Sequence, residues 1–404
     1  MAYDLLEGVK VVELSMYAFA PASAAVLGDW GADVIKVVPP LIPDTLMGNA
    51  IGGLPNEDVG VAFMWEIMNR GKRCIGIDVS VDDGRELLLE LVRDADVFIT
   101  NLLPARRRRF RLDPDDLFAF NPGLVYGRAS GHGDRGPERE YGGYDHTDFW
   151  ARTGLGHAAS MVAGEFAPQA GPALGDLASG ALLAGAIAAA LVRKGRTGRG
   201  AVVDVSLLSV GMWMMSPGVV ASQLYGVDNI PRYRHADLPN PLVAGYVTRD
   251  NRIVYMSGIQ TEGHFENFCE IIGRKDLVDD PRFANGTARQ AHTRECIAVL
   301  DEVFAERDLA EWVTLLERLS TPWSIVQSAA EAAVDPQVTA NEYVTEVEGA
   351  TRPFPLVASP AQFDDVATGL TRAPDHGEHT EEILLEMGRD WDEILRLKEK
   401  GAVL

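Results

Sequence analysis

Residues 9–38, VKVVELSMYAFAPASAAVLGDWGADVIKVV, decide the fold of this 404-residue chain. Two runs of strand-forming residues, 9–15 and 32–38, flank a segment rich in small residues, 22–30, that is predicted to form a helix. A strand, a helix and a second strand in this order are typical of a βαβ unit with parallel strands. The chain therefore opens as an α/β protein.

The same alternation continues along the chain. Further strand-like runs occur at 74–79, 96–102, 123–130 and 201–209, with a predicted helix at 83–93. This pattern predicts a parallel sheet covered by helices on both faces. The first turn between strand and helix reads SMYAFAPASA and contains no GxGxxG motif, so we expect no NAD or FAD site there.

A polar region, 225–241, marks a predicted domain boundary. It is followed by two alternating apolar runs within 244–258, joined by Asp250 and Asn251, which is a strong hairpin signal. Helices are predicted at 261–272, 287–306 and 308–319. We therefore expect a large domain formed by 1–224 and 321–404, and a smaller α+β domain formed by 225–320.

Composition excludes several functions. The chain has 37 basic and 59 acidic residues, a net charge of -22, so its surface repels nucleic acid. Its three cysteines form no CxxC motif, which argues against disulfides and a metal site and favours a cytoplasmic location. The N-terminus has no basic region typical of a signal peptide, and the apolar run 177–192 is short for a membrane span. We expect no membrane partner.

Asp176 is the residue most suggestive of chemistry. It stands at the start of a long helix rich in small residues, in the segment 174–200, LGDLASGALLAGAIAAALVRKGRTGRG. The positive end of the helix dipole favours an ionised carboxylate at this position. Two interpretations are open: an N-cap, which the local pattern by itself favours, or a nucleophile.

Taken together, the motifs resemble those of the class III CoA-transferases, the CaiB/BaiF family. The resemblance spans nearly the whole chain and rests on LEGVKVVEL (6–14), LGDWGADVIKV (27–37), NRGKRCIGIDV (69–79), DVFITNLLP (96–104), NPGLVYGRASGHGDRGP (121–137), GGYD (142–145), the segment 174–200 and APDHGEHTEEILLEMG (373–388). The resemblance implies a Rossmann-like, doubly wound large domain built from both ends of the chain. It also implies an interlaced homodimer.

The resemblance further implies that Asp176 is the catalytic nucleophile. Its carboxylate would attack an acyl-CoA to give a mixed anhydride and then carry CoA as an aspartyl thioester to a carboxylic acid acceptor. This chemistry needs no tightly bound cofactor, because coenzyme A and its acyl ester are the substrates. A thioester intermediate must be shielded from water.

Further site residues are assigned by resemblance. Residues expected to bind CoA are Asn69, Arg70, Lys72, Arg73, Asn101 and Arg109. Residues expected to line the acyl site are Tyr17, Ala18, Tyr144 and Asp145. For the arginines at 106–108, a solvated helix face paired with the acidic run 113–116 is an equally good interpretation. His132 and His146 are expected in exposed loops.

Two alternatives remain open on the sequence. One is an α-methylacyl-CoA racemase, but relatives of that kind carry GHD where this chain has Tyr144 in GYD, and a phenol is a poor base near neutral pH. The other is a non-catalytic CoA-binding subunit, which the presence of Asp176 argues against. An apolar first turn with Tyr17 and Phe19 predicts an acyl group larger or more hydrophobic than formate or oxalate. The donor and acceptor acids are not specified.

Overall fold

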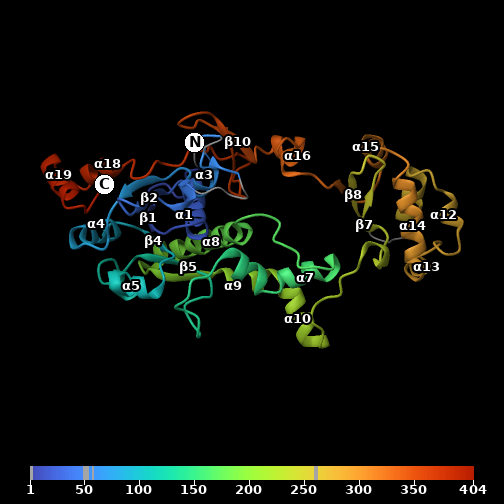
Figure 1. Ribbon diagram of the computed structural model, residues 1–404, viewed down its shortest axis with the longest axis horizontal. Helices are drawn as coiled ribbons and strands as arrows, with labels where there is room; N and C mark the ends of the chain where they lie inside the picture. Colours follow the sequence, from blue (N-terminus) through green and yellow to red (C-terminus); the bar gives the residue numbers. More distant parts are fainter. Residues whose placement is uncertain (1–2, 49–53, 57–58, 259–262) are drawn as a thin grey trace. The chain divides into compact units, whose positions relative to one another are not determined.

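The computed structural model describes residues 3–48, 54–56, 59–258 and 263–404. The chain divides into two compact units. The larger contains residues 1–160, 166–229 and 336–404, and the smaller contains 161–165 and 230–335. Figure 1 shows the larger unit in blue, green and red, which reflects its assembly from both ends of the chain.

A parallel sheet of six strands forms the centre of the larger unit. Its strands are β1 (Lys10–Leu14), β2 (Asp33–Val38), β3 (Arg73–Gly76), β4 (Val97–Thr100), β5 (Val125–Ser130) and β6 (Ala201–Ser206). The order across the sheet is β3-β2-β1-β4-β5-β6, and every neighbouring pair is parallel. This is the doubly wound order, which reverses direction between β1 and β4. The predicted α/β class and the predicted strands are confirmed.

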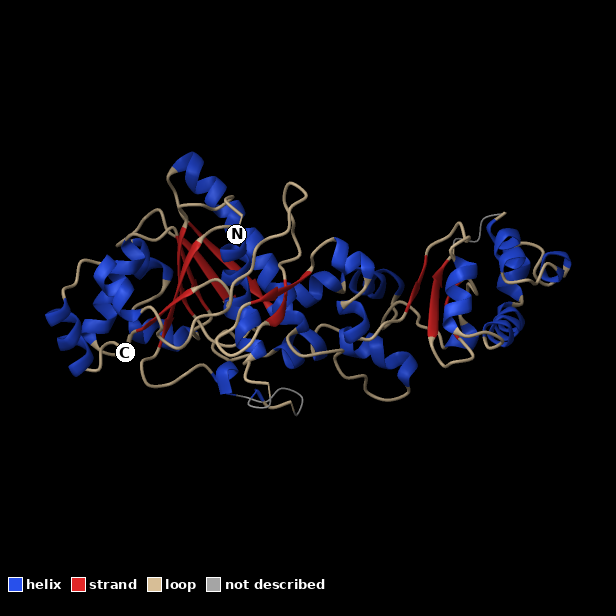
Figure 2. Cartoon of the chain, turned by 90° about the horizontal axis from the view of Figure 1, so that it is seen from above, coloured by secondary structure: helices blue, strands red, loops and turns tan. Residues whose placement is uncertain are grey.

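Helices cover both faces of this sheet (Figure 2). On one face, α4 (Asp82–Arg93) packs with the C-terminal helices α18 (Thr380–Glu386) and α19 (Trp391–Glu399), through side chains such as Leu88, Ile383 and Leu397. On the other face lie α1 (Phe19–Asp29) and α8 (Leu174–Thr197). The C-terminal segment therefore completes the core that the first strands begin.

Helices α1 and α8 approach closely because Gly180 has no side chain. A Cβ atom at Gly180 would lie 2.7 Å from the Cβ of Ala22, too close for ordinary contact. The apolar α8 is 24 residues long, so it extends beyond the run 177–192 and is long enough to cross a membrane. About a third of its most apolar stretch is buried in this unit. Core helices of soluble proteins can be equally long and equally apolar, so these two properties do not identify a membrane span.

The smaller unit has a three-stranded antiparallel sheet, β7 (Val243–Val247), β8 (Ile253–Ser257) and β9 (Trp323–Ile325). The predicted hairpin is β7 and β8, and Asn251 at its turn has a positive φ of 60°. Its helices are α11 (His264–Ile271), α12 (Asp276–Asp279), α13 (Gly286–Ala291), α14 (Thr293–Phe304), α15 (Leu309–Leu316) and α16 (Ala329–Ala333), with the short η3 (His235–Asp237). The predicted helix 287–306 is thus two helices, and residues 261 and 262 of the first predicted helix lie outside the described part of the chain.

The unit boundaries differ from the predicted 225–320. Besides residues 161–165, the smaller unit contains 230–335. It extends past 320 because β9 pairs with β8 and adds a third strand, which the short apolar run 323–325 did not predict. The remaining elements of the chain are α2 (Thr45–Gly48), α3 (Phe63–Asn69), α5 (Pro104–Phe110), α6 (Pro114–Phe118), η2 (Asp145–Ala151), α7 (Leu155–Ala163), α9 (Leu207–Met214), α10 (Ser216–Tyr225), α17 (Pro336–Ala340) and the β10–β11 hairpin (Val344–Val347, Phe354–Val357).

Candidate active site

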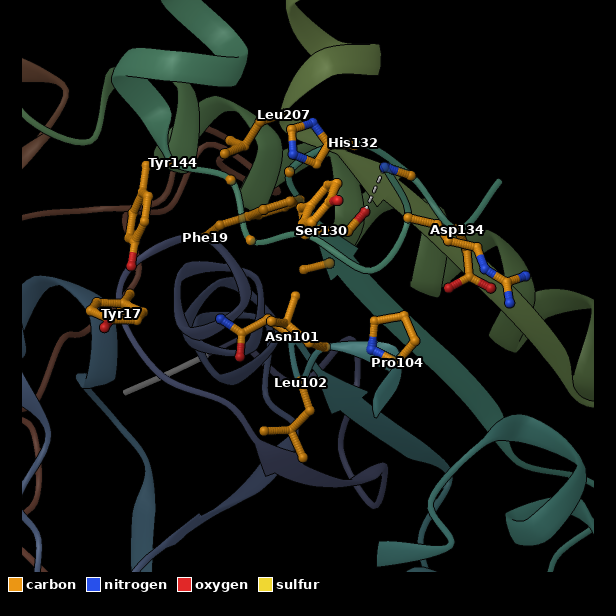
Figure 3. Close-up of a pocket in the computed structure, with 18 of the residues that line it drawn as sticks. Tyr17, Phe19, Asn101, Leu102, Pro104, Ser130, His132, Asp134, Tyr144 and Leu207 are labelled. Carbon is orange, nitrogen blue, oxygen red and sulfur yellow. Dashed lines mark hydrogen bonds between the residues drawn. The ribbon is translucent and has the colours of Figure 1, made fainter. Parts of the chain in front are cut away.

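A cavity of about 320 Å³ opens at the carboxyl end of the large sheet (Figure 3). Its walls come from the segments that follow β1, β4 and β5, the loop up to Tyr144, and single residues of two helices, Asp176 and Leu207. In a doubly wound sheet, ligands bind where the strand order reverses, beyond the carboxyl ends of the strands. The cavity occupies that place, because β1 and β4 both end at it.

Asn101 joins the two strand ends. Its side chain accepts a hydrogen bond from the Met16 backbone N–H (3.2 Å) and donates one to the Met16 carbonyl (2.7 Å). Asn101 follows β4 directly and lines the cavity, while its contact with CoA stays a prediction. Because both of these hydrogen bonds join the Asn101 amide to Met16, Asn101 holds the turn after β1, with Met16 and Tyr17, at the cavity wall.

Asp176 also lines the cavity, from the first turn of α8. It is not the N-cap: that position is Ala173, with a φ of 58°, and no side chain caps this helix. Burial raises the pKa of the Asp176 carboxyl, with a further contribution from the charge of Asp145, to about 7. The expected effect of the helix N-terminus, which would favour the ionised form, is therefore outweighed by the loss of water.

A glycine allows Asp145 to approach the nucleophile candidate. Gly175, just before Asp176, donates its backbone N–H to Asp145 (2.9 Å), and a Cβ there would lie 2.3 Å from the Phe149 ring and 2.4 Å from the Asp145 carboxylate. The second oxygen of Asp145 accepts a bond from the Gln169 side chain (2.6 Å). Asp145 is buried and accepts hydrogen bonds from two uncharged donors. Since neither donor neutralises its charge, Asp145 helps to raise the pKa of Asp176.

Tyr17 and Tyr144 form an edge-to-face pair at the cavity, with ring centres 5.8 Å apart and planes at 79°. Figure 3 shows the two rings together at one side of the site. Tyr17 has a positive φ of 64°, unusual for a residue with a side chain. A hydrogen bond to Tyr144 raises the pKa of Tyr17. Ala18 is buried beside them but does not line the cavity.

The run of arginines at 106–109 divides between different environments. Arg106 and Arg107 line the cavity, and Arg107 is buried and paired with Asp113 (2.9 Å) and Asp134 (2.7 Å). Arg108 pairs with Glu140. The predicted CoA contact, Arg109, lies outside the cavity wall, with its guanidinium 5.5 Å from the Phe110 ring centre. Arg106 and Arg109 are three positions apart on α5, so Arg109 lies about one turn farther along the helix axis than Arg106.

The other predicted CoA residues do not reach the cavity. Lys72 is fully buried and donates to Glu13 (2.6 Å), to two backbone carbonyls and to Asn69. Arg70 is buried against Asp29 (2.6 Å), and Arg73 pairs with Asp33 and Glu386. Acidic partners far away in the sequence pair with Arg70, Lys72 and Arg73. Asn69 bonds to the Trp65 carbonyl and to Lys72.

For His132, the environment in the structure differs from the one that the sequence predicted. His132 is not an exposed loop histidine: it lines the cavity, and its Nδ1 lies 2.7 Å from a carboxylate oxygen of Asp148. His146 is exposed, as expected. Asp148 and Gln169 were not singled out by any motif, and the separation of 16 positions between His132 and Asp148 carries no sequence signal. Only the turn of η2 brings the two together.

Known proteins provide the comparison for this site. CoA-transferase family III matches residues 6–380 of the chain. The (R)-2-hydroxy-4-methylpentanoate CoA-transferase of Clostridioides difficile is 33% identical over 99% of both chains. The succinyl-CoA:glutarate CoA-transferase of Homo sapiens is 30% identical, covering 95% of this chain and 86% of the relative. A solved structure, of a CAIB/BAIF family protein from Brucella suis, matches with a TM-score of 0.82 and 28% identity over 96% of this chain and 100% of that one.

Proposed function

Because this chain belongs to CoA-transferase family III, and so transfers CoA between an acyl-CoA and a carboxylate, we propose that Asp176 carries the group in transit. One observation supports this assignment above the others. Asp176 is the carboxylate at the cavity wall whose pKa is raised to about 7, by burial and by Asp145. A more basic carboxylate is a better nucleophile, and near neutral pH much of it is still ionised.

The proposed reaction has two symmetrical halves. An Asp176 oxygen attacks the thioester carbonyl, the carbon–sulfur bond breaks, and a mixed anhydride and CoA thiolate result. The thiolate then attacks the aspartyl carbonyl, which releases the donor acid as a carboxylate and leaves an aspartyl–CoA thioester. The acceptor carboxylate repeats these steps in reverse order, which regenerates ionised Asp176. No proton, electron or water is consumed.

The cavity wall provides the surroundings that these steps need. Side chains of Phe19, Leu207 and the Tyr17–Tyr144 pair limit access of water to an intermediate on Asp176. Asp176 lies in the first turn of α8, where the positive end of the helix dipole favours a developing oxyanion, although the Gly175 N–H of that turn is already bound to Asp145. Both features support the assignment from the cavity itself.

We propose that Arg106 and Arg139, which line the cavity, hold phosphates of CoA. Positive charge at this place offsets a net charge of -22, which otherwise disfavours an anionic substrate. The chain offers a matched test, since Arg106 and Arg109 lie on the same helix. Arg106→Gln is expected to raise KM for an acyl-CoA about tenfold, whereas Arg109→Gln leaves it unchanged. Equal effects of both substitutions would contradict the proposal.

The acceptor acid is proposed from the relatives and the cavity. The relative that is 33% identical is named for a 2-hydroxy acid, so we propose 2-hydroxy acids with an apolar chain as the substrates to test first.

We also propose a homodimer, which the exposed apolar side chains Trp213, Leu224 and Tyr225 on α9 and α10 support. Size-exclusion chromatography that gives a single 43.8 kDa species would exclude the dimer.

The experiment that tests the mechanism is trapping of the intermediate. The enzyme is incubated with an acyl-CoA and then with hydroxylamine or borohydride, and the peptide containing Asp176 is examined by mass spectrometry. We expect the hydroxamate or alcohol at Asp176 only when acyl-CoA is present. An active enzyme whose Asp176 peptide stays unmodified would exclude the covalent mechanism.

A further inference from the structure

The cavity contains a histidine held by a buried carboxylate, separate from the nucleophile. Nδ1 of His132 lies 2.7 Å from Oδ1 of Asp148, which is 2% exposed. The other oxygen of Asp148 accepts bonds from the Tyr144 backbone N–H (2.9 Å) and from the Thr147 hydroxyl (2.7 Å). Asp148 is therefore fixed on η2 by two donors, and it fixes the imidazole in turn.

These contacts decide which nitrogen of His132 carries the proton. A carboxylate oxygen can only accept, so the 2.7 Å contact requires a proton on Nδ1. Arg152 (3.3 Å) and Glu138 (3.6 Å) also approach Nδ1, but they form an ion pair with each other. Within the described part of the chain, Nε2 has no hydrogen-bond partner. A neutral His132 thus offers the cavity a lone pair on Nε2.

The other residues of the cavity wall favour an uncharged hydrogen-bond donor on the substrate as the partner of this lone pair. Figure 3 shows His132 beside Leu207 and Ser130, and the Ser130 oxygen already accepts the Gly133 N–H (3.0 Å). Arg107 is neutralised by Asp113 and Asp134. If the substrate carried a second carboxylate here, the charges of Asp176 and Asp145 would repel it. Among the described residues, no unpaired cation contacts His132 to offset this repulsion.

We propose that His132, oriented by Asp148, accepts a hydrogen bond from the hydroxyl group of a 2-hydroxyacyl substrate and so selects hydroxyacyl over deoxyacyl chains. His132 and Asp176 both line this cavity and are linked through η2, where Asp148 contacts His132 and Asp145 binds the Gly175 N–H next to Asp176. We therefore place the hydroxyl on C2, the carbon adjacent to the reacting carbonyl. The inference rests on the proposed function, because it assumes that the acyl chain occupies this cavity. His132 then sets specificity and takes no part in the covalent steps.

Binding to the Asp176→Ala variant tests the inference without turnover. Dissociation constants are measured for a matched pair, 2-hydroxy-4-methylpentanoyl-CoA, as its separate enantiomers, and 4-methylpentanoyl-CoA. We expect one hydroxy thioester to bind about tenfold more tightly than the deoxy thioester, the effect of one neutral hydrogen bond in a protected site. Adding His132→Phe should abolish this preference and leave the affinity for the deoxy thioester within about threefold.

Two further variants exclude a purely structural effect. Adding His132→Gln, whose amide oxygen can accept a hydrogen bond, should restore part of the preference. Adding His146→Phe, on the exposed side of the same segment, should not change it. No preference in Asp176→Ala itself, or an equal preference after His132→Phe in a folded protein, would overturn the inference. Failure of the covalent mechanism would instead appear as an unmodified Asp176 in the trapping experiment, whatever the binding ratio.

Discussion

Asp176 and Glu13 are carboxylates of the same large unit with opposite surroundings. Glu13, on β1, is fully buried, and burial by itself would raise its pKa. Lys36 (2.9 Å) and Lys72 (2.6 Å) reverse that effect and hold the Glu13 pKa well below its usual range. No cation among the described residues pairs with Asp176, and burial together with the charge of Asp145 raises its pKa to about 7. Burial disfavours charge at both places, and the partner decides the outcome.

The difference separates a structural charge from a reactive one. Glu13 and the two lysines join β1, β2 and the turn after α3, and none of the three lines the cavity. A carboxylate that is neutralised and hydrogen-bonded is a weak nucleophile, whereas one that lacks a cation stays basic. Four predictions test this contrast.

The largest effect is expected from removing the reactive carboxylate. Asp176→Asn should lower kcat for CoA transfer by about 10⁴-fold or more, because the other carboxylate on the cavity wall, Asp134, is paired with Arg107 and Arg128. The folded-state pKa of Asp176 lies above its ordinary value, so its ionisation destabilises the fold progressively as pH rises from that ordinary value to about 7, and the loss then levels off. Asn should therefore raise the melting temperature more at pH 8 than at pH 5. A variant with near-native kcat would contradict the assignment.

The next effect is on stability. Glu13→Gln leaves Lys36 and Lys72 buried without a counter-charge and should cost about 3–5 kcal/mol of unfolding free energy, measured by urea denaturation. The exposed Glu7→Gln is the matched control and should change stability little. If Glu13→Gln left the free energy of unfolding almost unchanged, the buried network would tolerate the loss of its anion. That result would weaken the contrast with Asp176.

The third prediction concerns pH. Only ionised Asp176 attacks, so the rate of intermediate formation should rise about tenfold between pH 6 and pH 8 and level off above the pKa. Rapid-quench measurement of the aspartyl–CoA thioester provides that rate before later steps contribute. A rate that stays constant from pH 5 to pH 8 would mean that the carboxylate has an ordinary pKa.

The smallest effect should come from Asp145. Asp145→Asn removes the charge near Asp176 while keeping an oxygen for the Gly175 N–H, so the midpoint of the pH profile should move below 7. Burial, the larger cause, remains, and the midpoint should stay above the ordinary range of an aspartate. Asp115→Asn, an exposed residue, should leave the profile unchanged. A midpoint that rises in Asp145→Asn would exclude a charge effect.

Much of the fold follows from local sequence. The alternation of strands and helices predicts the parallel sheet, because most of its strands are buried on both faces and read as apolar runs, with the edge strand β6 more exposed. The hairpin at Asn251 is predicted because its turn residues tolerate a positive φ. The strand β9 was missed, since three residues bounded by a proline carry little periodicity and form a strand only by pairing with β8.

The candidate site was predicted less completely, and for a physical reason. Asp176, Asn101, Tyr17 and Tyr144 reach the cavity from positions that motifs mark. The basic residues of 69–73 were expected at CoA, yet Glu13, Asp29 and Asp33 neutralise three of them across the fold. A motif specifies a residue type, but the availability of a charge depends on which partners the fold brings to it.

By itself, the sequence determined the α/β class and the family, and it made Asp176 the candidate nucleophile, because these follow from motifs of neighbouring residues. Only the tertiary structure decided that Asp176 is a basic carboxylate without a cation, that Arg106 and not Arg109 faces the cavity, and that His132 meets Asp148. Each of these facts depends on solvent exclusion or on distance between residues far apart in the chain. Local sequence encodes neither quantity.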